Sequence, residues 1–138
     1  MIAKRYNMKK LLLLLLLLPL TMLAQGPPNC VPTTIIINLD QYQSETSWTI
    51  QDTSGNIITD GGNYGGQPDY ASVLEQRCLP EGPLVFTIYD TYGDGLNGAI
   101  WGGLDGSYYL IQCNDTLVYG DDPAFQNDSI HVFVSDGC

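Results

Sequence analysis

Positively charged residues are scarce in this sequence. Only five of its 138 residues are Lys or Arg, against 15 Asp and Glu. Four of the five stand within the first ten residues, which leaves Arg77 as the one Lys or Arg further along the chain. A chain this acidic repels nucleic acid and anionic lipid, so neither is an expected partner. The same charge attracts divalent cations and basic surfaces.

Residue types and motifs that carry catalysis are also rare. His131 is the only histidine, and it lies in a segment of alternating apolar residues that is typical of a strand. Neither a nucleophile elbow nor an H-E-x-x-H helix is present. A carboxylate pair for glycoside hydrolysis remains open with 15 acidic residues. We nevertheless expect a protein that is not an enzyme.

The first 24 residues have the pattern of a signal peptide. A basic start is followed by the unbroken leucine run Leu11–Leu18 and a small residue, Ala24, before Gln25. The apolar run is shorter than the roughly 20 residues that span a bilayer. We predict cleavage after Ala24, which leaves residues 25–138 as a single secreted domain without membrane insertion. An uncleaved membrane anchor is the alternative.

Four cysteines follow the predicted leader, and no two of them form a C-x-x-C pair. An even number of cysteines in an exported chain indicates two disulfides, whereas a zinc site would need closer spacing. Four cysteines allow three connectivities, which sequence alone does not decide. We predict that Cys30 pairs with Cys138 and that Cys78 pairs with Cys113.

The hydrophobic pattern predicts an all-β fold. Short alternating or β-branched runs are separated by turns rich in Gly, Pro and Asp. We predict an antiparallel β-sandwich of about eight strands, of the jelly-roll type. Strands are expected at 33–39, 46–51, 56–59, 83–89, 107–112, 116–119 and 129–135, a flexible loop at 60–69 and a short helical turn at 71–76.

The most informative segment is Asp90–Gly106, which contains three aspartates, one asparagine and six glycines after a predicted strand. Carboxylates spaced among glycines are typical of a loop that wraps oxygen ligands around Ca²⁺. Its twelfth residue is Trp101, where an EF-hand requires a bidentate glutamate, so an EF-hand is excluded. The alternative is a glycine-rich turn whose aspartates only cap backbone amides.

Within this segment Asp90 and Asp94 are the first predicted calcium ligands, and Asn97 and Asp105 come next. Glu45 would join them if its segment lies beside the loop. Calcium is therefore the expected cofactor.

Aromatic residues are more numerous than one small core requires. Trp101 and Tyr92 lie within the polar loop and are the predicted ligand-binding residues, because aromatic rings beside acids and amides suit sugar stacking. Other aromatics expected at the surface are Tyr42, Tyr64, Tyr70, Tyr108 and Tyr119, and those expected in the core are Trp48, Tyr89 and Tyr109. The alternative is that the surface rings only shield loop glycines.

Three separated motifs resemble a domain common in secreted Bacteroidetes proteins. Residues 40–50, DQYQSETSWTI, are similar to its "DxYPSETSWxL" opening; residues 78–79 give its "CL" turn and 86–95, FTIYDTYGDG, its strand and loop. Residues 106–110, GSYYL, match its "GSYxL" strand, and the similarity covers about residues 34–135. The chain departs at Gln43, where proline is usual, and at Gly82-Pro83, where a second cysteine is usual. The resemblance implies an extracellular, usually non-catalytic β-sandwich, and no particular ligand.

These observations predict a secreted or cell-surface module that binds or adheres, stabilised by calcium. The expected partner is an extracellular glycan or a cell-surface protein. The alternative is a structural subunit that self-associates into an extracellular layer or filament. Thr116 and Ser129 each follow an aspartate and precede an aliphatic residue, a weak pattern for O-glycosylation in Bacteroidetes.

Overall fold

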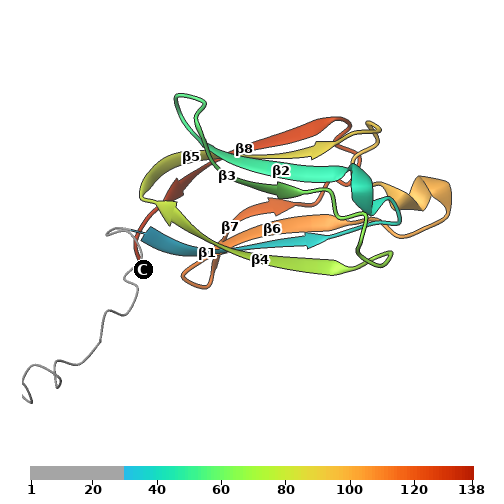
Figure 1. Cartoon of the computed structure of the whole chain (residues 1–138), viewed down its shortest axis with the longest axis horizontal. Coiled ribbons are helices and arrows are strands. Elements are labelled where there is room, and N and C mark those ends of the chain that lie inside the picture. Colours follow the sequence, from blue (N-terminus) through green and yellow to red (C-terminus); the bar gives the residue numbers. More distant parts are fainter. Residues whose placement is uncertain (1–29) are drawn as a thin grey trace, which may run out of the picture.

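The computed structural model describes residues 30–138, which form two four-stranded antiparallel β-sheets packed face to face (Figure 1). The predicted all-β sandwich is therefore confirmed, whereas the predicted signal peptide, residues 1–24, lies outside the described residues. No helix among residues 30–138 is long and apolar enough to cross a membrane. The elements are β1 (Cys30–Asn38), η1 (Gln43–Glu45), β2 (Thr46–Asp52), β3 (Ile57–Gly62), β4 (Ser72–Pro80), β5 (Gly82–Asp90), η2 (Gly98–Trp101), β6 (Ser107–Gln112), β7 (Asp115–Gly120) and β8 (Asp128–Ser135), where η marks a 3₁₀ turn.

One sheet has the strand order β4-β1-β6-β7 and the other the order β3-β2-β5-β8. Every neighbouring pair is antiparallel, and the edges are therefore β4 and β7 in the first sheet and β3 and β8 in the second. This order does not confirm the jelly-roll subtype that we predicted.

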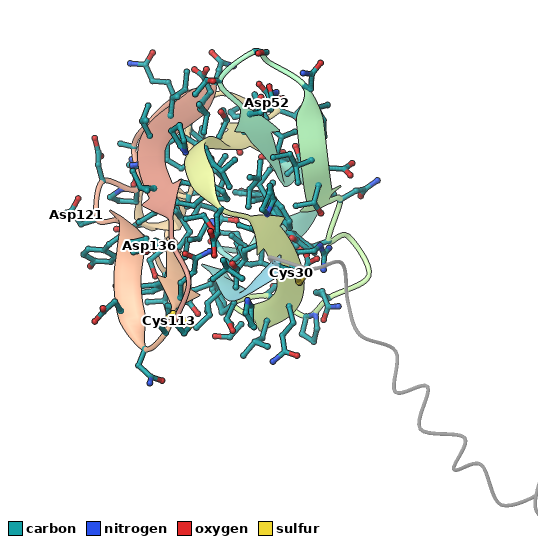
Figure 2. All side chains as sticks on the ribbon, turned by 90° about the vertical axis from the view of Figure 1, so that its left-hand side faces the viewer. Cys30, Asp52, Cys113, Asp121 and Asp136 are labelled. Carbon is teal, nitrogen blue, oxygen red and sulfur yellow. A yellow bond between two sulfur atoms is a disulfide. The ribbon has the colours of Figure 1, made fainter. Side chains whose placement is uncertain are left out.

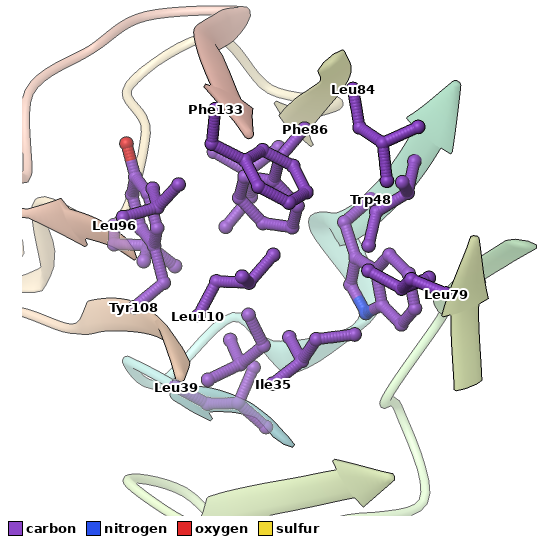
Figure 3. Close-up of a cluster of buried hydrophobic side chains, with 14 of the residues drawn as sticks. Ile35, Leu39, Trp48, Leu79, Leu84, Phe86, Leu96, Tyr108, Leu110 and Phe133 are labelled. Atoms are coloured by element: carbon purple, nitrogen blue, oxygen red, sulfur yellow. The ribbon is translucent and has the colours of Figure 1, made fainter. Parts of the chain in front are cut away.

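The core lies between the two sheets and follows the period-two alternation of the strands. Ile35 and Leu110 come from one sheet, and Trp48 and Phe86 come from the other (Figure 3). All four are essentially inaccessible to solvent. Burial of one side chain of this size contributes roughly 1.5–3 kcal/mol. The face of each sheet that carries these apolar side chains is therefore the face that packs against the other sheet.

Two predicted surface aromatics, Tyr64 and Tyr108, are in fact buried in this core. Tyr108 of β6 lies opposite Gly120 of β7, and a Cβ atom at that glycine would lie 2.0 Å from the tyrosine ring. The ring therefore covers the glycine and is withdrawn from solvent. The prediction that both are surface residues is wrong, because it rested on the number of aromatic residues and not on their neighbours in the fold.

Residues 72–76, which we expected to be a helical turn with Ala71, belong to strand β4 instead. They have few β-branched side chains, so intrinsic propensity favoured a helix. Pairing with β1 over its whole length overrides that preference, for example through Ile37 opposite Val73. Strand β3 likewise extends into the predicted loop as far as Gly62.

The disulfides join Cys30 to Cys78 and Cys113 to Cys138. All four cysteines are paired as predicted, but the connectivity that we predicted is wrong. Cys30 and Cys78 lie on the neighbouring strands β1 and β4, and the Cα atoms of each bridge are 5.3 Å apart. In the chain-entropy model loops of these lengths contribute about 4 and about 3.5 kcal/mol.

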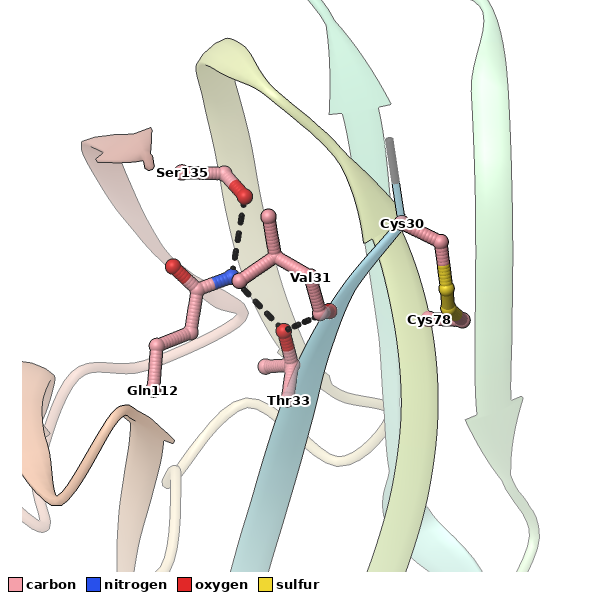
Figure 4. The surroundings of a disulfide bond; sticks show 6 residues. All are labelled: Cys30, Val31, Thr33, Cys78, Gln112 and Ser135. Carbon is pink, nitrogen blue, oxygen red and sulfur yellow. Dashed lines mark hydrogen bonds between the residues drawn. A yellow bond between two sulfur atoms is a disulfide. The ribbon is translucent and has the colours of Figure 1, made fainter. Parts of the chain in front are cut away.

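Near the first bridge a buried amide connects the two sheets (Figure 4). The Gln112 side chain of β6 donates hydrogen bonds to Thr33 Oγ1 of β1 at 2.7 Å and to Ser135 Oγ of β8 at 2.9 Å. Strand β8 belongs to the opposite sheet, so this side chain holds the two sheets in a fixed relation. Hydrogen bonds of this kind contribute about 1 kcal/mol each.

Arg77, the only Lys or Arg among residues 30–138, is used within the fold. Its guanidinium lies 5.4 Å from the ring centroid of Trp48 and forms an ion pair with Glu75. The Trp48 indole N–H donates to the Tyr64 hydroxyl, which in turn donates to Glu75. Burial and the bond to Glu75 raise the pKa of Tyr64, so the hydroxyl remains a donor.

The two ends of the sandwich differ in their connections. The short turns, at residues 53–56, 81 and 113–114, lie at one end together with both disulfides, and Figure 2 faces that end. The four longer loops, residues 39–45, 63–71, 91–106 and 121–127, all lie at the opposite end. We call this opposite end the loop end. Side chains far apart in the sequence can meet there, as the conjectured participation of Glu45 in the predicted calcium site requires.

Candidate functional site

The predicted calcium loop begins at Asp90, the last residue of β5, whose side chain is buried. Its Oδ1 accepts hydrogen bonds from the backbone N–H groups of Gly93 and Asp94, which folds the chain back over the carboxylate. Gly95 then turns with a φ of +76°, and a Cβ atom there would lie 2.2 Å from the Pro123 carbonyl oxygen. Only glycine satisfies both conditions without strain.

Glu45 joins this loop from a different part of the sequence, as we conjectured. It ends η1, and the next residue, Thr46, pairs with Asp90 across β2 and β5. Thr91 donates two hydrogen bonds, from its backbone N–H and its hydroxyl, to the Glu45 carbonyl oxygen, both at 3.1 Å. Strand pairing and this clamp therefore fix Glu45 beside the start of the loop.

Three carboxylates meet as a result. Glu45, Asp90 and Asp94 each have a carboxylate oxygen within 4.8 Å of those of the other two, and we call this group the acidic cluster. Asp40, which lies two residues after the end of β1, is a buried fourth acid whose pKa is raised by burial and by the charges of Asp94 and Asp90. Sequence reasoning missed Asp40, although it is the first residue of the DQYQSETSW motif.

The acidic cluster has no compensating positive side chain among residues 30–138, because their only Lys or Arg is paired with Glu75. Burial, followed by the charges of Asp90, Asp94 and Asp40, raises the pKa of Glu45. Burial is also the largest cause of the raised pKa of Asp90, with the charge of Asp94 adding to it and backbone donors opposing it. The acidic cluster therefore favours the binding of a positively charged group.

Asp94 contributes two different oxygens. Its Oδ2 accepts a hydrogen bond from the Trp101 indole N–H. Its Oδ1 is buried and has no hydrogen-bond partner among the described residues. A buried oxygen without a partner is costly, and each case in a folded protein calls for an explanation.

Asp105, one of the other two predicted ligands, is not part of the acidic cluster. Asp105 accepts a hydrogen bond from the Ala99 backbone N–H at 2.8 Å, so its carboxylate closes the first turn of η2. Asn97 is half-buried immediately before η2 and makes no side-chain capping bond. Asp105 thus caps a backbone amide, as the alternative to a calcium loop predicts. Asp90 also accepts from backbone amides but belongs to the acidic cluster as well.

Beside the acidic cluster is a small cavity of about 180 Å³ lined by three aromatic rings and one carboxylate, which we call the aromatic pocket. Its lining residues are Tyr42, Glu45, Tyr92 and Trp101. Tyr92 and Trp101, the two predicted ligand-binding residues, meet edge to face with centroids 6.1 Å apart and are 66% and 52% exposed. The two rings therefore remain available to a ligand.

The ring of Trp101 is oriented by the loop that carries it. Gln41 donates from Nε2 to the Gly98 carbonyl oxygen at 3.1 Å and so attaches η2 to the segment after β1. The Gly103 N–H also donates to Gly98 at 3.0 Å, which closes the loop behind the tryptophan. Because its indole N–H also donates to Asp94, both the backbone around Trp101 and its side chain are fixed by hydrogen bonds.

Gln43, where the resembled domain usually has proline, is buried in η1. Its side chain donates to Asp69, and its carbonyl oxygen accepts from the Tyr64 backbone N–H at 3.2 Å. This departure from the motif thus connects the loops at 39–45 and 63–71.

His131 lies on the inner side of β8 and contacts the hydroxyls of Tyr108 at 2.7 Å and Ser129 at 3.1 Å. Burial lowers the pKa of His131, which keeps the ring neutral at pH 7. Of the two predicted glycosylation residues, Thr116 is exposed on β7, whereas the Ser129 hydroxyl accepts a hydrogen bond from Tyr108.

No protein-family model, no curated protein and no solved structure matches this chain. The resemblance to the secreted Bacteroidetes domain stays a prediction.

Proposed function

We propose that this protein is a secreted, non-catalytic binding module whose loop end is stabilised by calcium. The observation that carries the proposal is the acidic cluster, in which one buried oxygen, Asp94 Oδ1, has no partner among the described residues. A bound cation would give this oxygen a partner and would neutralise carboxylates that otherwise repel each other.

The geometry and chemistry of the cluster support calcium among the common cations. Ca²⁺ binds oxygen ligands at 2.3–2.6 Å, so ligand oxygens on one ion lie at most about 5 Å apart. The carboxylate oxygens of Glu45, Asp90 and Asp94 satisfy that limit. With neither His nor Cys in the cluster, a softer metal such as zinc is disfavoured. Backbone carbonyls and water would complete the coordination.

A binding role, rather than catalysis, is supported by the surroundings of the cluster. The aromatic pocket next to it is small and carries one carboxylate, Glu45, without a partner base or nucleophile in its lining. We assign the contact between Ser129 and His131 a structural role, since no carboxylate bonds the histidine among the described residues. The expected partner is an extracellular glycan or a cell-surface protein, reached through the loop end.

Calorimetric titration of the exported protein with calcium, after dialysis against EGTA, tests the proposal. We expect one saturable site, with affinity that falls strongly in Asp94→Asn and Glu45→Gln. Glu81→Gln is the matched control, because Glu81 is exposed in the short turn before β5, at the opposite end from the cluster. Absence of saturable heat in the unmodified protein, with its fold intact, would contradict the calcium site.

A second candidate is a self-assembling structural subunit, and it is favoured by strand β8. This strand is a sheet edge, and its outward residues Ile130, Val132 and Val134 are 62%, 74% and 59% exposed. Residues 128–136, DSIHVFVSD, have a nearly palindromic pattern about Val132, which suits antiparallel pairing of two copies.

Sedimentation velocity tests this second candidate. We expect concentration-dependent association that Val132→Lys removes, since a charge on an exposed edge opposes strand pairing. Leu74→Lys is the control, because Leu74 is also an exposed residue (60%) but lies on the other sheet's edge strand β4. A monomer at all concentrations would contradict self-assembly through β8.

A further inference from the structure

We propose that the aromatic pocket receives the cationic side chain of a lysine or arginine from a basic segment of a partner protein. This inference deepens the proposed function and rests on the binding role assigned there to the loop end. It requires only the folded pocket and concerns the calcium-free protein, because Glu45 is both a lining residue of the pocket and a proposed calcium ligand.

The size of the aromatic pocket suits one extended side chain. Its volume of about 180 Å³ lies below the roughly 300–1,000 Å³ that is usual for pockets that hold drug-sized ligands. A chain of several sugar rings would extend well beyond it. The faces of aromatic rings cover the methylene stem of a lysine or arginine while its charged end remains in contact with polar groups.

Charge complementarity identifies the ligand as a cation. Glu45 lines the pocket, and its carboxylate lies within 4.8 Å of those of Asp90 and Asp94 in the acidic cluster. No Lys or Arg of residues 30–138 is free to neutralise them, because Arg77 is already paired. The electron-rich faces of Trp and Tyr attract cations as well, so the rings and the carboxylates favour the same kind of ligand.

The hydrogen-bonding groups of the pocket favour this cation over a glycan. The Trp101 indole N–H, its one donor apart from the tyrosine hydroxyls and the backbone, is already bonded to Asp94. Sugar hydroxyls need donors as well as acceptors, whereas a lysine or arginine has donors only and needs the acceptors that Glu45 supplies.

The same chemistry already stabilises another part of this fold. Arg77 lies over the Trp48 ring at 5.4 Å from the centroid and pairs with Glu75 at the same time. The aromatic pocket likewise contains a tryptophan, Trp101, and a glutamate, Glu45, but no Lys or Arg of residues 30–138 lines it. The partner would supply the missing one.

Fluorescence anisotropy with labelled peptides tests the proposal. The probes are the heptapeptides GKGKGKG and GRGRGRG, with GQGQGQG as the uncharged control, each measured against the exported protein in EGTA at physiological ionic strength. We expect saturable binding of the lysine and arginine peptides only. Glu45→Gln and Trp101→Ala should each weaken that binding about tenfold, as expected for loss of one charge or cation–π contact.

Two matched controls separate the pocket from general electrostatic attraction. Glu81→Gln removes the same charge at the short-turn end, and Tyr119→Ala removes an exposed ring from β7. Both should bind the charged peptides with unchanged affinity. Equal weakening by Glu45→Gln and Glu81→Gln, or no saturable binding of either charged peptide, would overturn the inference. Because binding is measured without calcium, that failure is distinguishable from a failed calcium titration.

Discussion

Asp94→Asn should change the stability of this protein in opposite directions with and without calcium. In the metal-free protein the charge of Asp94 repels Asp40, Glu45 and Asp90, and it contributes to the raised pKa of each. At the 4.8 Å limit of the acidic cluster, one such repulsion costs about 1–3 kcal/mol for effective dielectric constants of 80 to 20.

The lower end of that range applies to this site, because Glu45 is partly exposed and solvent screens its charge. The substitution should therefore stabilise the metal-free protein by about 1 kcal/mol and raise its Tm by roughly 3–6 °C. The amide keeps the shape of the side chain and can still accept the Trp101 indole hydrogen bond, so packing is preserved.

With calcium the sign reverses. A ligand at 100 times its Kd stabilises the folded state by about 2.7 kcal/mol, which corresponds to a Tm increase of about 10 °C for a domain of this size. The unmodified protein should show that increase, and Asp94→Asn should lose most of it because it removes one charged ligand.

Thermal unfolding followed by circular dichroism, in EGTA and in 10 mM calcium at equal ionic strength, measures both effects. Asp136→Asn is the matched control, because Asp136 is exposed after β8 at the short-turn end. If Asp94→Asn lowers Tm equally in both buffers, Asp94 acts only as the partner of Trp101 and the electrostatic reasoning is refuted.

Three further outcomes are expected. In the metal-free protein the carboxyl signals of Asp40 and Asp90 should titrate above pH 3.8 by NMR, because burial raises both pKa values. The stability that these two groups contribute is therefore fully present below pH 3.8 and is lost as the pH rises through the raised pKa values. Titration at or below pH 3.8 would contradict this expectation. Gly95→Ala should lower the free energy of unfolding by several kcal/mol in urea denaturation, since the turn has a φ of +76° and the added Cβ would meet a backbone oxygen; a loss below about 0.5 kcal/mol would show that the loop relaxes easily. Replacing Cys113 and Cys138 together by serine should cost about 3.5 kcal/mol in the same assay, and no change would show that this bridge does not constrain the unfolded chain.

The different ends of the sandwich combine a constrained scaffold with long loops. Both disulfides and the short turns hold one end, while the opposite end carries the four longer loops. The loop that begins at Asp90 can therefore be long and rich in glycine, because the sheets beneath it are fixed independently. Functional residues on loops over a rigid scaffold are a common arrangement in proteins.

Much of the fold was predictable from local pattern. Alternation around Phe86 and Val132 predicted β5 and β8, since one face of each strand must be buried. Strand β4 was not, because the local propensity of residues 72–76 favours a helix and they become a strand only by pairing with β1. The disulfide connectivity was not predictable either, since it depends on which strands become neighbours.

The acidic cluster was partly predictable in the same sense. The sequence by itself determined that Asp90 and Asp94 would lie close together, because a glycine-rich turn after a strand folds back on the residue that begins it. It also determined the excess of negative charge, which follows from composition alone. Tertiary structure decided the rest: pairing of β2 with β5 brings Glu45 to the loop, and the end of β1 brings Asp40, whereas Asp105 turns away to η2. Spacing along the chain governs contacts within one turn, but contacts between loops are set by the order of strands in the sheets.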